Sequence, residues 1–546
     1  MPPKKNKKAH KGAGGKSAPT DLHSKAAHEN FHDVFRLHGE NLRGGDSSPT
    51  SSLFEGRFGR MFRTLEPAEF SDDDLKALAG KMIADFDDSP PDKDPADDEE
   101  NSGISAGYTY LGQFIDHDLT FDPASSLQTQ NDPDALEDYR TPRFDLDSLY
   151  GRGPDDQPYL YEEDGLKLLL GEGLDSVPNN PKPRDLPRNN KGRALIGDPR
   201  NDENKIVSQL HAVMVRFHNR MVEFIKQRDK VTPEFAQVQR AVRWHYQWVV
   251  LNDFLPKIVG QQVVDKILPR IKKGTSVREQ EPNLLYFEWQ KQPFMPIEFS
   301  AAAYRFGHSM VRPIYRLNTK LNRKVIFPGD GEDKDNTHSL GGFRPIPKDF
   351  AIDWSLFFAN VRKGKQPAKG KGRVQPSYKI DTSLVFPLGN LPGPMKDGIK
   401  SLAERNLRRG SRMDLPSGQS VARFMNIKPI DDKLLKVGKA TKDDSKDNPL
   451  LTKVSPNFAD NAPLWYYVLA EAQQAFKTNK TPIRLGPVGG RIVAEVFIGL
   501  LVGDKYSFLS QNPKWRPKEF TTDGTEHGEF GMAELIKQAM LARPND

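Results

Sequence analysis

The chain has 546 residues, with 43 Gly, 43 Pro and no cysteine, and 36% of its residues are hydrophobic. The absence of cysteine excludes disulfides, thiolate catalysis and cysteine-ligated zinc or haem. The formal net charge of +6 equals the six Lys in residues 1–20, a stretch without acids, so the rest of the chain is neutral overall. This distribution argues against a body that binds nucleic acid specifically.

The composition divides the chain into a tail and one large domain. Residues 1–50 are a Lys- and Gly-rich tail and entry segment that we expect to be largely disordered, with nonspecific contact to anionic surfaces as the alternative. Residues 51–546 are long enough to bury a large core, and they show no internal repeat. One large, mainly helical domain with long loops and little β-structure is therefore predicted.

Membrane and export signals are not apparent. Crossing a bilayer takes about 20 apolar residues, and the longest candidate, residues 493–502, contains Glu495 and is predicted to be a core helix. The N-terminus lacks the apolar run of a secretory signal. The compartment thus stays open between the cytoplasm and export by another route, and the oligomeric state is also open.

In chain order, the first predicted element is a helix over residues 72–86, with Leu75, Leu78 and Met82 in register. Residues 85–100 follow with nine acids and one Lys, which is typical of a surface loop rather than a metal site.

Residues 106–122 (AGYTYLGQFIDHDLTFD) form the helix around which the chain is organised. An apolar face recurs at helical intervals. Gln113, Asp116 and His117 share another face, an arrangement that is costly to bury unless it has a function. Asp118 lies about 100° further round the helix axis. Its side chain must therefore have a different role from those of the three residues on this face. The alternatives are a half-exposed helix with a polar side and a metal-dependent phosphohydrolase of the HD type.

Residues 141–151 (TPRFDLDSLYG) place oxygen ligands close together. Thr141, Asp145 and Asp147 alternate with other residues, so an extended or turning segment directs their oxygens to one side. Calcium takes six to eight oxygen ligands. A calcium site competes here with a plain Asp-rich turn.

Residues 198–204 (DPRNDEN) precede a strongly periodic helix over residues 206–225, and their Pro and acids suit a helix start. We interpret the two histidines of this helix, His211 and His218, as structural. A further helix is predicted over residues 235–259.

Residues 296–312 (PIEFSAAAYRFGHSMVR) are predicted to form another helix, in which Gly307 leaves the surface bare beside His308. A helical Gly costs about 1 kcal/mol relative to Ala, which is easier to explain if a large group lies close. A buried His bound to the backbone is the alternative. The acidic residues 328–336 lack EF-hand spacing and receive no site.

These residues together fit one chemistry. A haem that binds peroxide needs one imidazole on the iron, a second imidazole to move the peroxide proton, and a guanidinium to stabilise negative charge as the O–O bond breaks. The chain supplies a His on each of two predicted helices and an Arg beside a carboxylate.

At this point the sequence resembles the animal-type haem peroxidases, the superfamily that includes myeloperoxidase and the cyclooxygenases, from about residue 54 to about residue 509. Any single motif is weak, whereas the matching segments follow one another in the family's order. They are GQFIDHDLTF, RFDLDSLYG, GDPRNDEN, LHAVMVRFHNRM, LNDFLPKIVG, YRFGHSMVRP and NLRRGSRMDLP.

The resemblance implies roles on the distal side of a haem b. His117 would be the acid–base residue, and Gln113 its neighbour, bonded to water or a small anion. Arg200 would polarise the peroxide. Asp116 and Glu203 match the carboxylates that form ester links to the haem in family members.

On the proximal side, the resemblance implies that His308 is the axial iron ligand. Asn406 would accept a hydrogen bond from the other ring nitrogen of His308. Arg409 would face a haem propionate.

The resemblance also adds Asp118 to the calcium site. With it come the side chains and one carbonyl of the loop, which are Thr141, Arg143 (through its carbonyl), Asp145 and Asp147. Asp147 stands where mammalian members have a serine, and the extra carboxylate should strengthen the attraction for a divalent ion.

Two positions separate this chain from particular relatives. Asn204 stands where myeloperoxidase has the methionine of its third haem link, which argues against efficient chloride oxidation and leaves bromide, iodide and thiocyanate. Cyclooxygenases and fatty-acid dioxygenases carry a radical-forming Tyr three residues before the proximal His, where this chain has Arg305. Tyr304 lies one residue before that position, so its side chain is expected to point about 100° away from it around the helix.

The resemblance therefore implies a haem peroxidase in which hydrogen peroxide forms a ferryl species that small phenols or halides reduce, with a link to oxidative stress. The alternatives are a fatty-acid dioxygenase of the same superfamily and a haem- and calcium-binding interaction protein with little turnover.

Overall fold

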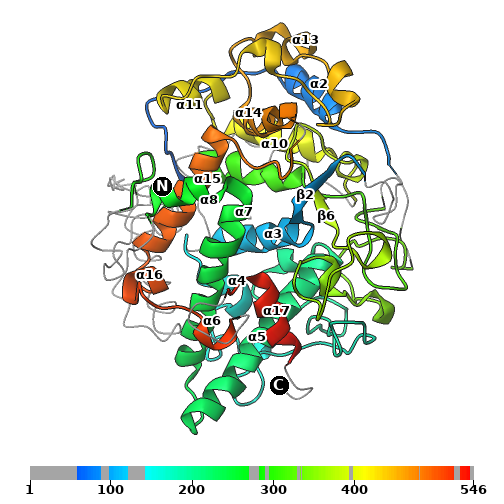
Figure 1. The fold of residues 1–546 in the computed structure, drawn as a ribbon, viewed down its shortest axis with the longest axis vertical. Helices are drawn as coiled ribbons and strands as arrows, with labels where there is room; N and C mark the ends of the chain where they lie inside the picture. The colour runs from blue at the N-terminus through cyan, green and yellow to red at the C-terminus, as the bar shows by residue number, and fades with distance from the viewer. Residues whose placement is uncertain are drawn as a thin grey trace, which may run out of the picture.

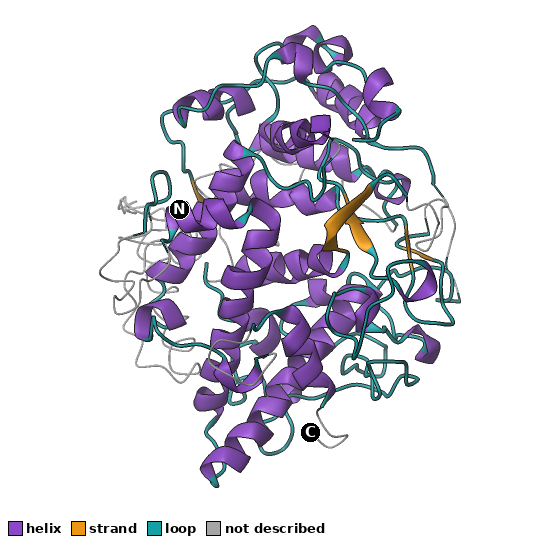
Figure 2. Cartoon of the chain, in the orientation of Figure 1, coloured by secondary structure: helices purple, strands orange, loops and turns teal. Residues whose placement is uncertain are grey.

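Helices are the predominant secondary structure of the computed structural model (Figures 1 and 2). It describes residues 58–87, 97–120, 142–269, 282–288, 294–328, 333, 335–392, 398–478, 480–521 and 529–541. The helices of its first half are α2 (Asp72–Met82), α3 (Gly107–Leu119), α4 (Asp147–Tyr150), α5 (Lys205–Asp229), α6 (Phe235–Val249), α7 (Leu255–Val259), α8 (Gln261–Ile267) and α9 (Ile297–Ser300). Those of its second half are α10 (Leu402–Arg412), α11 (Gly418–Phe424), α12 (Asp444–Asp447), α13 (Leu451–Val454), α14 (Leu464–Gln473), α15 (Pro487–Gly503), α16 (Phe508–Gln511) and α17 (Met532–Met540).

Helix α3 lies near the middle of the view in Figure 1, with α10 and α14 above it and α5 below it. Its burial explains that place, because ten of its 13 residues are buried, including His117 and Asp118. Helix α5 is the longest described helix and packs on α3, α6 and α17. The predicted apolar stripe of α5 is confirmed, since Ile206, Leu210 and Val213 are all buried.

The predicted core helix is α15, which is buried along most of its length. Its one acid, Glu495, is fully buried and accepts the backbone N–H groups of Leu285, Tyr286 and Phe287. These bonds satisfy a carboxylate that would otherwise be costly to bury. Among the described helices, none combines the length and the apolar character that a bilayer crossing requires.

The strands are short and serve as connections. Strand β2 (Glu100–Ser105) pairs antiparallel with β6 (Pro376–Tyr378) immediately before α3. Strand β1 (Phe58–Gly59) pairs parallel with β3 (Met295–Pro296), and β4 (Ile314–Tyr315) pairs antiparallel with β5 (Lys324–Val325). The predicted fold class, mainly helical with little β-structure, is confirmed.

Three predicted helix ranges need correction. The helix predicted over residues 72–86 ends at Met82, where the chain becomes extended. The helix predicted over residues 235–259 is interrupted by a π-helical segment, η4 (Val250–Phe254). The helix predicted over residues 296–312 does not form as one element. Instead α9 stops at Ser300, and a 3₁₀ helix, η6 (Ala303–His308), carries the histidine.

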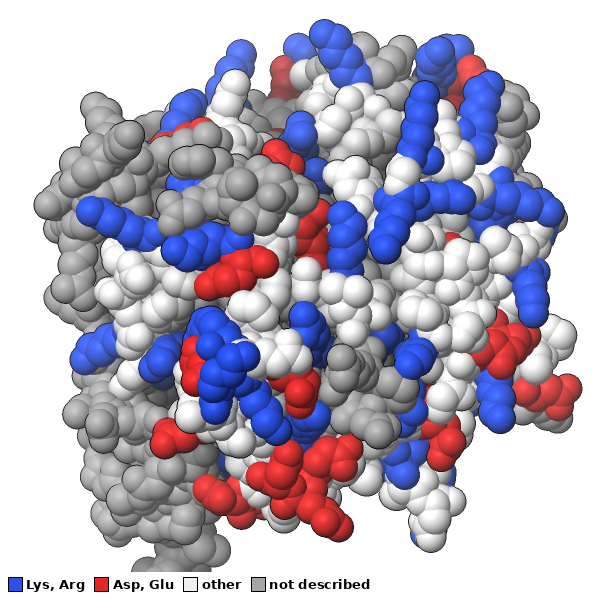
Figure 3. Space-filling view, turned by 60° about the horizontal axis from the view of Figure 1, so that its bottom comes forward, with Lys and Arg blue, Asp and Glu red and all other residues white. Residues whose placement is uncertain are grey.

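The view in Figure 3 shows Lys, Arg, Asp and Glu side chains sharing one face, with several acids gathered toward its lower edge. This mixture agrees with the near-neutral composition beyond residue 20. The predicted tail, residues 1–50, lies outside the described residues.

Candidate active site

A cavity of about 1180 Å³ lies between α3, η6, the loop around residue 342 and α10. Six residues predicted for the site border it, and Arg305, for which no site role is predicted, borders it as well. The six are Gln113, Asp116, His117, Arg200, Glu203 and His308. The chain thus brings residues about 190 positions apart to a single space.

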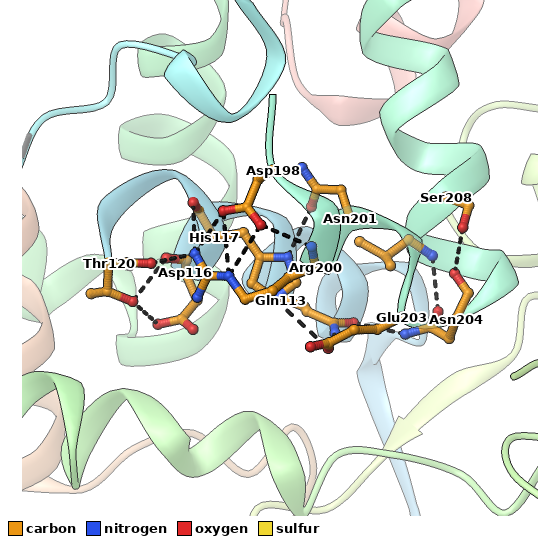
Figure 4. Close-up of polar contacts among 11 residues, drawn as sticks. Gln113, Asp116, His117, Thr120, Asp198, Arg200, Asn201, Glu203, Asn204 and Ser208 are labelled. Carbon is orange, nitrogen blue, oxygen red and sulfur yellow. Dashed lines mark hydrogen bonds and ion pairs between the residues drawn. The ribbon is translucent and has the colours of Figure 1, made fainter. Parts of the chain in front are cut away.

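The distal side is built on the last two turns of α3 and on the 3₁₀ helix η3 (Pro199–Asp202), which face one another in Figure 4. Asp198 begins η3 by accepting the N–H of Arg200 at 2.8 Å, and Asn204 begins α5 by accepting the N–H groups of Ile206 and Val207. These caps fix the DPRNDEN segment against the cavity.

His117 is 4% exposed, and both of its ring nitrogens have defined surroundings. Its Nδ1 lies 2.9 Å from Asn201 Oδ1, so the imidazole N–H donates to this amide. Its Nε2 lies 4.0 Å from Glu203 Oε2, across a gap too wide for a hydrogen bond. With the ring proton on Nδ1, the lone pair of the neutral imidazole is on Nε2, and His117 borders the cavity.

Arg200 is held by a buried carboxylate and by the end of α3. Its Nη2 donates to Asp198 Oδ2 at 2.8 Å and to the carbonyl of His117 at 3.1 Å, and it also donates to the carbonyl of Thr120 (Figure 4). A guanidinium is well suited to these C-terminal carbonyls. The contacts place a fixed positive charge beside His117.

Glu203 and Asn204 hold the amide of Gln113 between them. Gln113 Nε2 donates to Glu203 Oε2 at 3.0 Å, and Gln113 Oε1 accepts from Asn204 Nδ2 at 3.0 Å. Gln113, predicted to bond water or an anion, is therefore engaged with protein groups on both ends of its amide.

The two carboxylates expected to face a haem both border the cavity, and burial favours their neutral forms. Desolvation raises the pKa of Glu203 to about 7, against the opposing charge of Arg200. Desolvation also raises the pKa of Asp116, again opposed by Arg200. The Glu203 side chain is 39% exposed, because part of its surface faces the cavity.

On the opposite element, η6 presents His308 to the cavity. Burial, and then the charge of Arg305, lowers the pKa of His308 to about 3, so the imidazole is neutral at physiological pH. A Cβ built on the adjacent Gly307 would meet nothing within 4 Å. Gly307 borders the cavity, as the interpretation of a bare surface beside His308 requires.

The predicted contact between His308 and Asn406 is present, but its expected direction differs. Asn406 Nδ2 lies 2.7 Å from His308 Nδ1, while Asn406 Oδ1 accepts from Arg305 Nη1 at 3.0 Å. Arg305 has only donors to offer, so it takes the amide oxygen. Arg305 is predicted only to distinguish this chain from the dioxygenases, although its place on the element of His308 is a signal that it could belong to the site.

Cations also border the cavity on the α10 side. Arg405 and Lys400 are among the described residues that line the cavity here, whereas the predicted Arg409 is not. Arg409 is close enough to Arg305 for its charge to help burial lower the pKa of Arg305 to about 10. That Arg409 faces a haem propionate stays a prediction.

The predicted calcium residues converge beside α3. Carboxylate oxygens of Asp118, Asp145 and Asp147 lie within 4.8 Å of one another, and all three residues are buried. Asp118 Oδ2 accepts the N–H of Leu146, whose φ of 61° is the left-handed turn that brings Asp145 and Asp147 to the same side. Burying three acids together is costly without a cation.

The other predicted calcium ligands are less defined. Arg143 lies in the same bend and is half-buried, and Thr141 lies outside the described residues. The segment does turn, as predicted, and then enters α4.

His211 and His218, interpreted as structural, are both buried in α5. His218 bonds Tyr150 and the carbonyl of Leu166, and His211 bonds Asn201 at 3.1 Å. Asn201 was not singled out by the sequence, and no periodicity or spacing marks it.

The profile of the family described as animal haem peroxidase matches residues 128–540, which is more than half of the chain. The chain belongs to the animal haem peroxidase family. The matched range begins after α3, so the family profile does not include this helix. The comparison of α3 with the family rests on the fold and on the motif that α3 carries.

Curated relatives of the chain include proteins named as peroxidases. The chain is 25% identical over 323 residues to "Thyroid peroxidase" of Rattus norvegicus, an alignment that covers 57% of this chain and 31% of the rat protein. The chain spans about a third of the length of the curated relatives it matches.

Solved structures share the fold. "Peroxidase A" from Dictyostelium discoideum has a TM-score of 0.55 at 16% identity, covering 92% of this chain and 96% of its own. A fatty acid alpha-dioxygenase of Oryza sativa has a TM-score of 0.54 at 14% identity, covering 90% of this chain and 79% of its own. The fold is that of the peroxidase–cyclooxygenase superfamily.

Proposed function

We propose that this chain is a haem peroxidase that uses hydrogen peroxide to oxidise small electron donors, either phenols or the halide-like anions bromide, iodide and thiocyanate. One observation carries the proposal. Two imidazoles, His117 and His308, reach one large cavity from separate elements, with the guanidinium of Arg200 bordering the same space.

The residues present fit a haem b. The cavity is of the size that holds a large cofactor. His308 is neutral, as an iron ligand must be, and Gly307 leaves room beside it. Arg305, Arg405 and Lys400 border the cavity as partners for propionates, and Asp116 and Glu203 stand where ester links would form.

The chain's own residues perform the proton and charge steps. Bound in this cavity, haem would supply an iron that takes up peroxide and accepts oxidising equivalents from it. His117 Nε2 removes the proton from peroxide and returns it to the departing oxygen. Arg200 stabilises the negative charge on that oxygen.

Asn406 orients His308 from behind. If His308 held the iron through Nε2, its Nδ1 would carry the ring proton and would need an acceptor. The Asn406 amide, whose Nδ2 faces Nδ1 here, would then have to turn its oxygen from Arg305 toward His308.

Calcium is part of the proposal. Asp118, Asp145 and Asp147 supply at least three hard oxygen ligands at one buried point. The ion would connect the loop at residues 142–147 to the helix that carries His117.

The test is an absorption spectrum of the full chain loaded with haem, recorded before and after stoichiometric hydrogen peroxide. A Soret band that changes with peroxide and recovers when a phenol is added would support the proposal. A Soret band that does not change with peroxide would favour a haem-binding interaction protein. If the chain retains no haem, His117 and His308 would be interpreted as structural residues.

One observation keeps fatty-acid dioxygenase as the second candidate. Tyr304 borders the cavity, and its hydroxyl donates to the carbonyl of Gly112 at 3.2 Å. Tyr304 thus reaches the cavity even though successive residues of the 3₁₀ helix η6 are turned by about 120° from one another. Oxygen uptake with a long-chain fatty acid that is lost in Tyr304→Phe would favour the dioxygenase.

A further inference from the structure

Asn201 is the middle member of a hydrogen-bonded row that begins at His117 and continues away from the cavity to His211. Its Oδ1 accepts from His117 Nδ1 at 2.9 Å, and its Nδ2 donates to His211 Nδ1 at 3.1 Å. Asn201 is fully buried, and His117 and His211 are 4% and 1% exposed. The row therefore runs from α5 through η3 to α3, three elements that pack on one another.

The row is directional, because each member has a fixed number of donors and acceptors. An amide has one oxygen and one NH2 group, and a neutral imidazole has one N–H and one lone pair. If the amide were reversed, Asn201 Nδ2 would donate to His117 Nδ1. His117 would then carry its proton on Nε2 and could not accept one from the cavity.

His211 sets the direction of the amide. Burial lowers its pKa to about 4, so the ring is neutral and carries a single proton. The edge of Phe114 packs on the ring of His211, with the centroids 6.1 Å apart. Asn201 Nδ2 faces His211 Nδ1, so a neutral His211 with its proton on Nε2 accepts from the amide and leaves the amide oxygen toward His117.

We infer that Asn201 and His211 are positioning residues that hold His117 with its proton on Nδ1 and its Nε2 lone pair toward the cavity. This inference rests on the proposed function, because it names what prepares His117 for peroxide. Neither residue borders the cavity among the described lining residues, so both act through His117.

Substitutions of His211 and of Asn201 test the two hydrogen bonds of the row separately. His211→Phe removes the acceptor for the Asn201 amide, and His211→Asn returns an acceptor near the position of Nδ1. Asn201→Asp keeps an acceptor for His117, and Asn201→Leu removes it. His218→Phe is the matched control, because His218 is equally buried in α5 but bonds Tyr150 and Leu166.

The readout is the protonated nitrogen of His117, measured by ¹⁵N NMR of the full chain labelled on histidine. The chain is studied as the diamagnetic ferrous carbon monoxide complex, and the His117 signals are assigned by their loss in His117→Gln. The expected result is a proton on Nδ1 in the parent, His211→Asn, Asn201→Asp and His218→Phe proteins. His211→Phe and Asn201→Leu should show a mixture with Nε2–H, and their reaction with peroxide should slow by about tenfold, the effect of one lost hydrogen bond.

A His117 proton on Nε2 in the parent chain, or an unchanged Nδ1 proton in both His211→Phe and Asn201→Leu, would overturn the inference. If His211→Phe does not fold, the comparison of Asn201→Asp with Asn201→Leu makes the same test. If the chain retains no haem, the proposed function fails, whereas the position of the His117 proton can still be read in the haem-free chain. The two failures are thus distinguishable.

Discussion

At the scale of single residues, the site depends on neutral and charged groups being kept in those states. His308 stays neutral because burial and the neighbouring Arg305 oppose its protonation. Arg200 stays charged and immobile through Asp198 and the last carbonyls of α3. A lone pair and a fixed cation on facing elements are what peroxide chemistry needs.

Replacing the imidazole of His308 tests its proposed role as the iron ligand. His308→Ala removes the one ligand proposed for iron, so the haem-to-protein ratio after gel filtration should fall close to zero. His338→Ala, at an exposed position, is the control and should bind haem as the parent does. Full haem content in His308→Ala would refute the proximal assignment.

The substitution Arg200→Ala tests the role of the fixed positive charge. Removing a preorganised positive group from a buried site costs a reaction about 10²–10³-fold, so the rate of reaction with peroxide should fall by that factor while haem stays bound. Stopped-flow absorption measures the rate. Arg193→Ala, on the preceding loop, provides the comparison, and an unchanged rate in Arg200→Ala would remove this residue from the mechanism.

At the scale of elements, α3 is the shared wall of the cavity and of the acidic cluster. His117 and Asp118 are adjacent, and a helix turns about 100° per residue, so one points to the cavity and the other to the loop at residues 142–147. We therefore expect a change at the cluster to affect the position of the His117 imidazole, which is proposed as the acid–base group.

Asp118→Asn should weaken calcium binding, because it removes one of three buried carboxylates. Calorimetric titration of the chelator-treated full chain with calcium should show at least a tenfold weaker affinity than the parent. Asp444→Asn, at the exposed end of α12, is the control. Equal affinity in Asp118→Asn and the parent would count against this site.

The junction between α14 and α15 has its own pH dependence. Glu471 accepts the N–H groups of Val488 and Gly489 at the start of α15, and burial raises its pKa to about 7. A raised carboxyl pKa means that the folded chain binds the proton more tightly than the unfolded chain. Stability contributed by this group is complete below the unfolded pKa of about 4.5 and is lost as pH rises through 7.

Glu471→Gln should therefore flatten the stability profile between pH 4.5 and 7. The limiting slope for one proton is about 1.4 kcal/mol per pH unit, and denaturant unfolding at several pH values measures it. Glu519→Gln, at an exposed position, should keep the parent profile. A parent and a Glu471→Gln protein with parallel profiles would disprove this origin of the pH dependence.

At the scale of the whole molecule, aromatic rings connect the helices around the site. Phe497 of α15 lies with its ring centroid 5.1 Å from Phe144, 5.2 Å from Tyr304 and 5.8 Å from Phe299. It thus joins the loop of the acidic cluster to the element of His308.

Phe497→Ala should cost about 3–5 kcal/mol in the free energy of unfolding, the range for truncating a buried Phe. Val502→Ala, half-buried at the end of the same helix, should cost far less. Chemical denaturation measures both. A loss below about 1 kcal/mol for Phe497→Ala would show that the ring does not join these elements.

Much of this fold could be predicted, and the exceptions have physical causes. Apolar periodicity located α3, α5 and the core helix α15, because burial of one face imposes that spacing. It failed at residues 296–312, where the chain breaks at Ala301 and tightens into η6. Nothing local to the sequence distinguishes a 3₁₀ turn from an α-helical one when neighbouring elements select it.

The sequence by itself determined which residue types are available and in what order. The order of the motifs, with His117, Arg200 and His308 within them, identified the family and a site with two imidazoles. Only the tertiary structure decided how those groups are used. Asn201 lies between His117 and His211, Arg305 takes the oxygen of Asn406, and Arg405 rather than Arg409 borders the cavity. Such contacts join residues up to about 100 positions apart, and hydrogen bonds and burial depend on distance in space rather than along the chain.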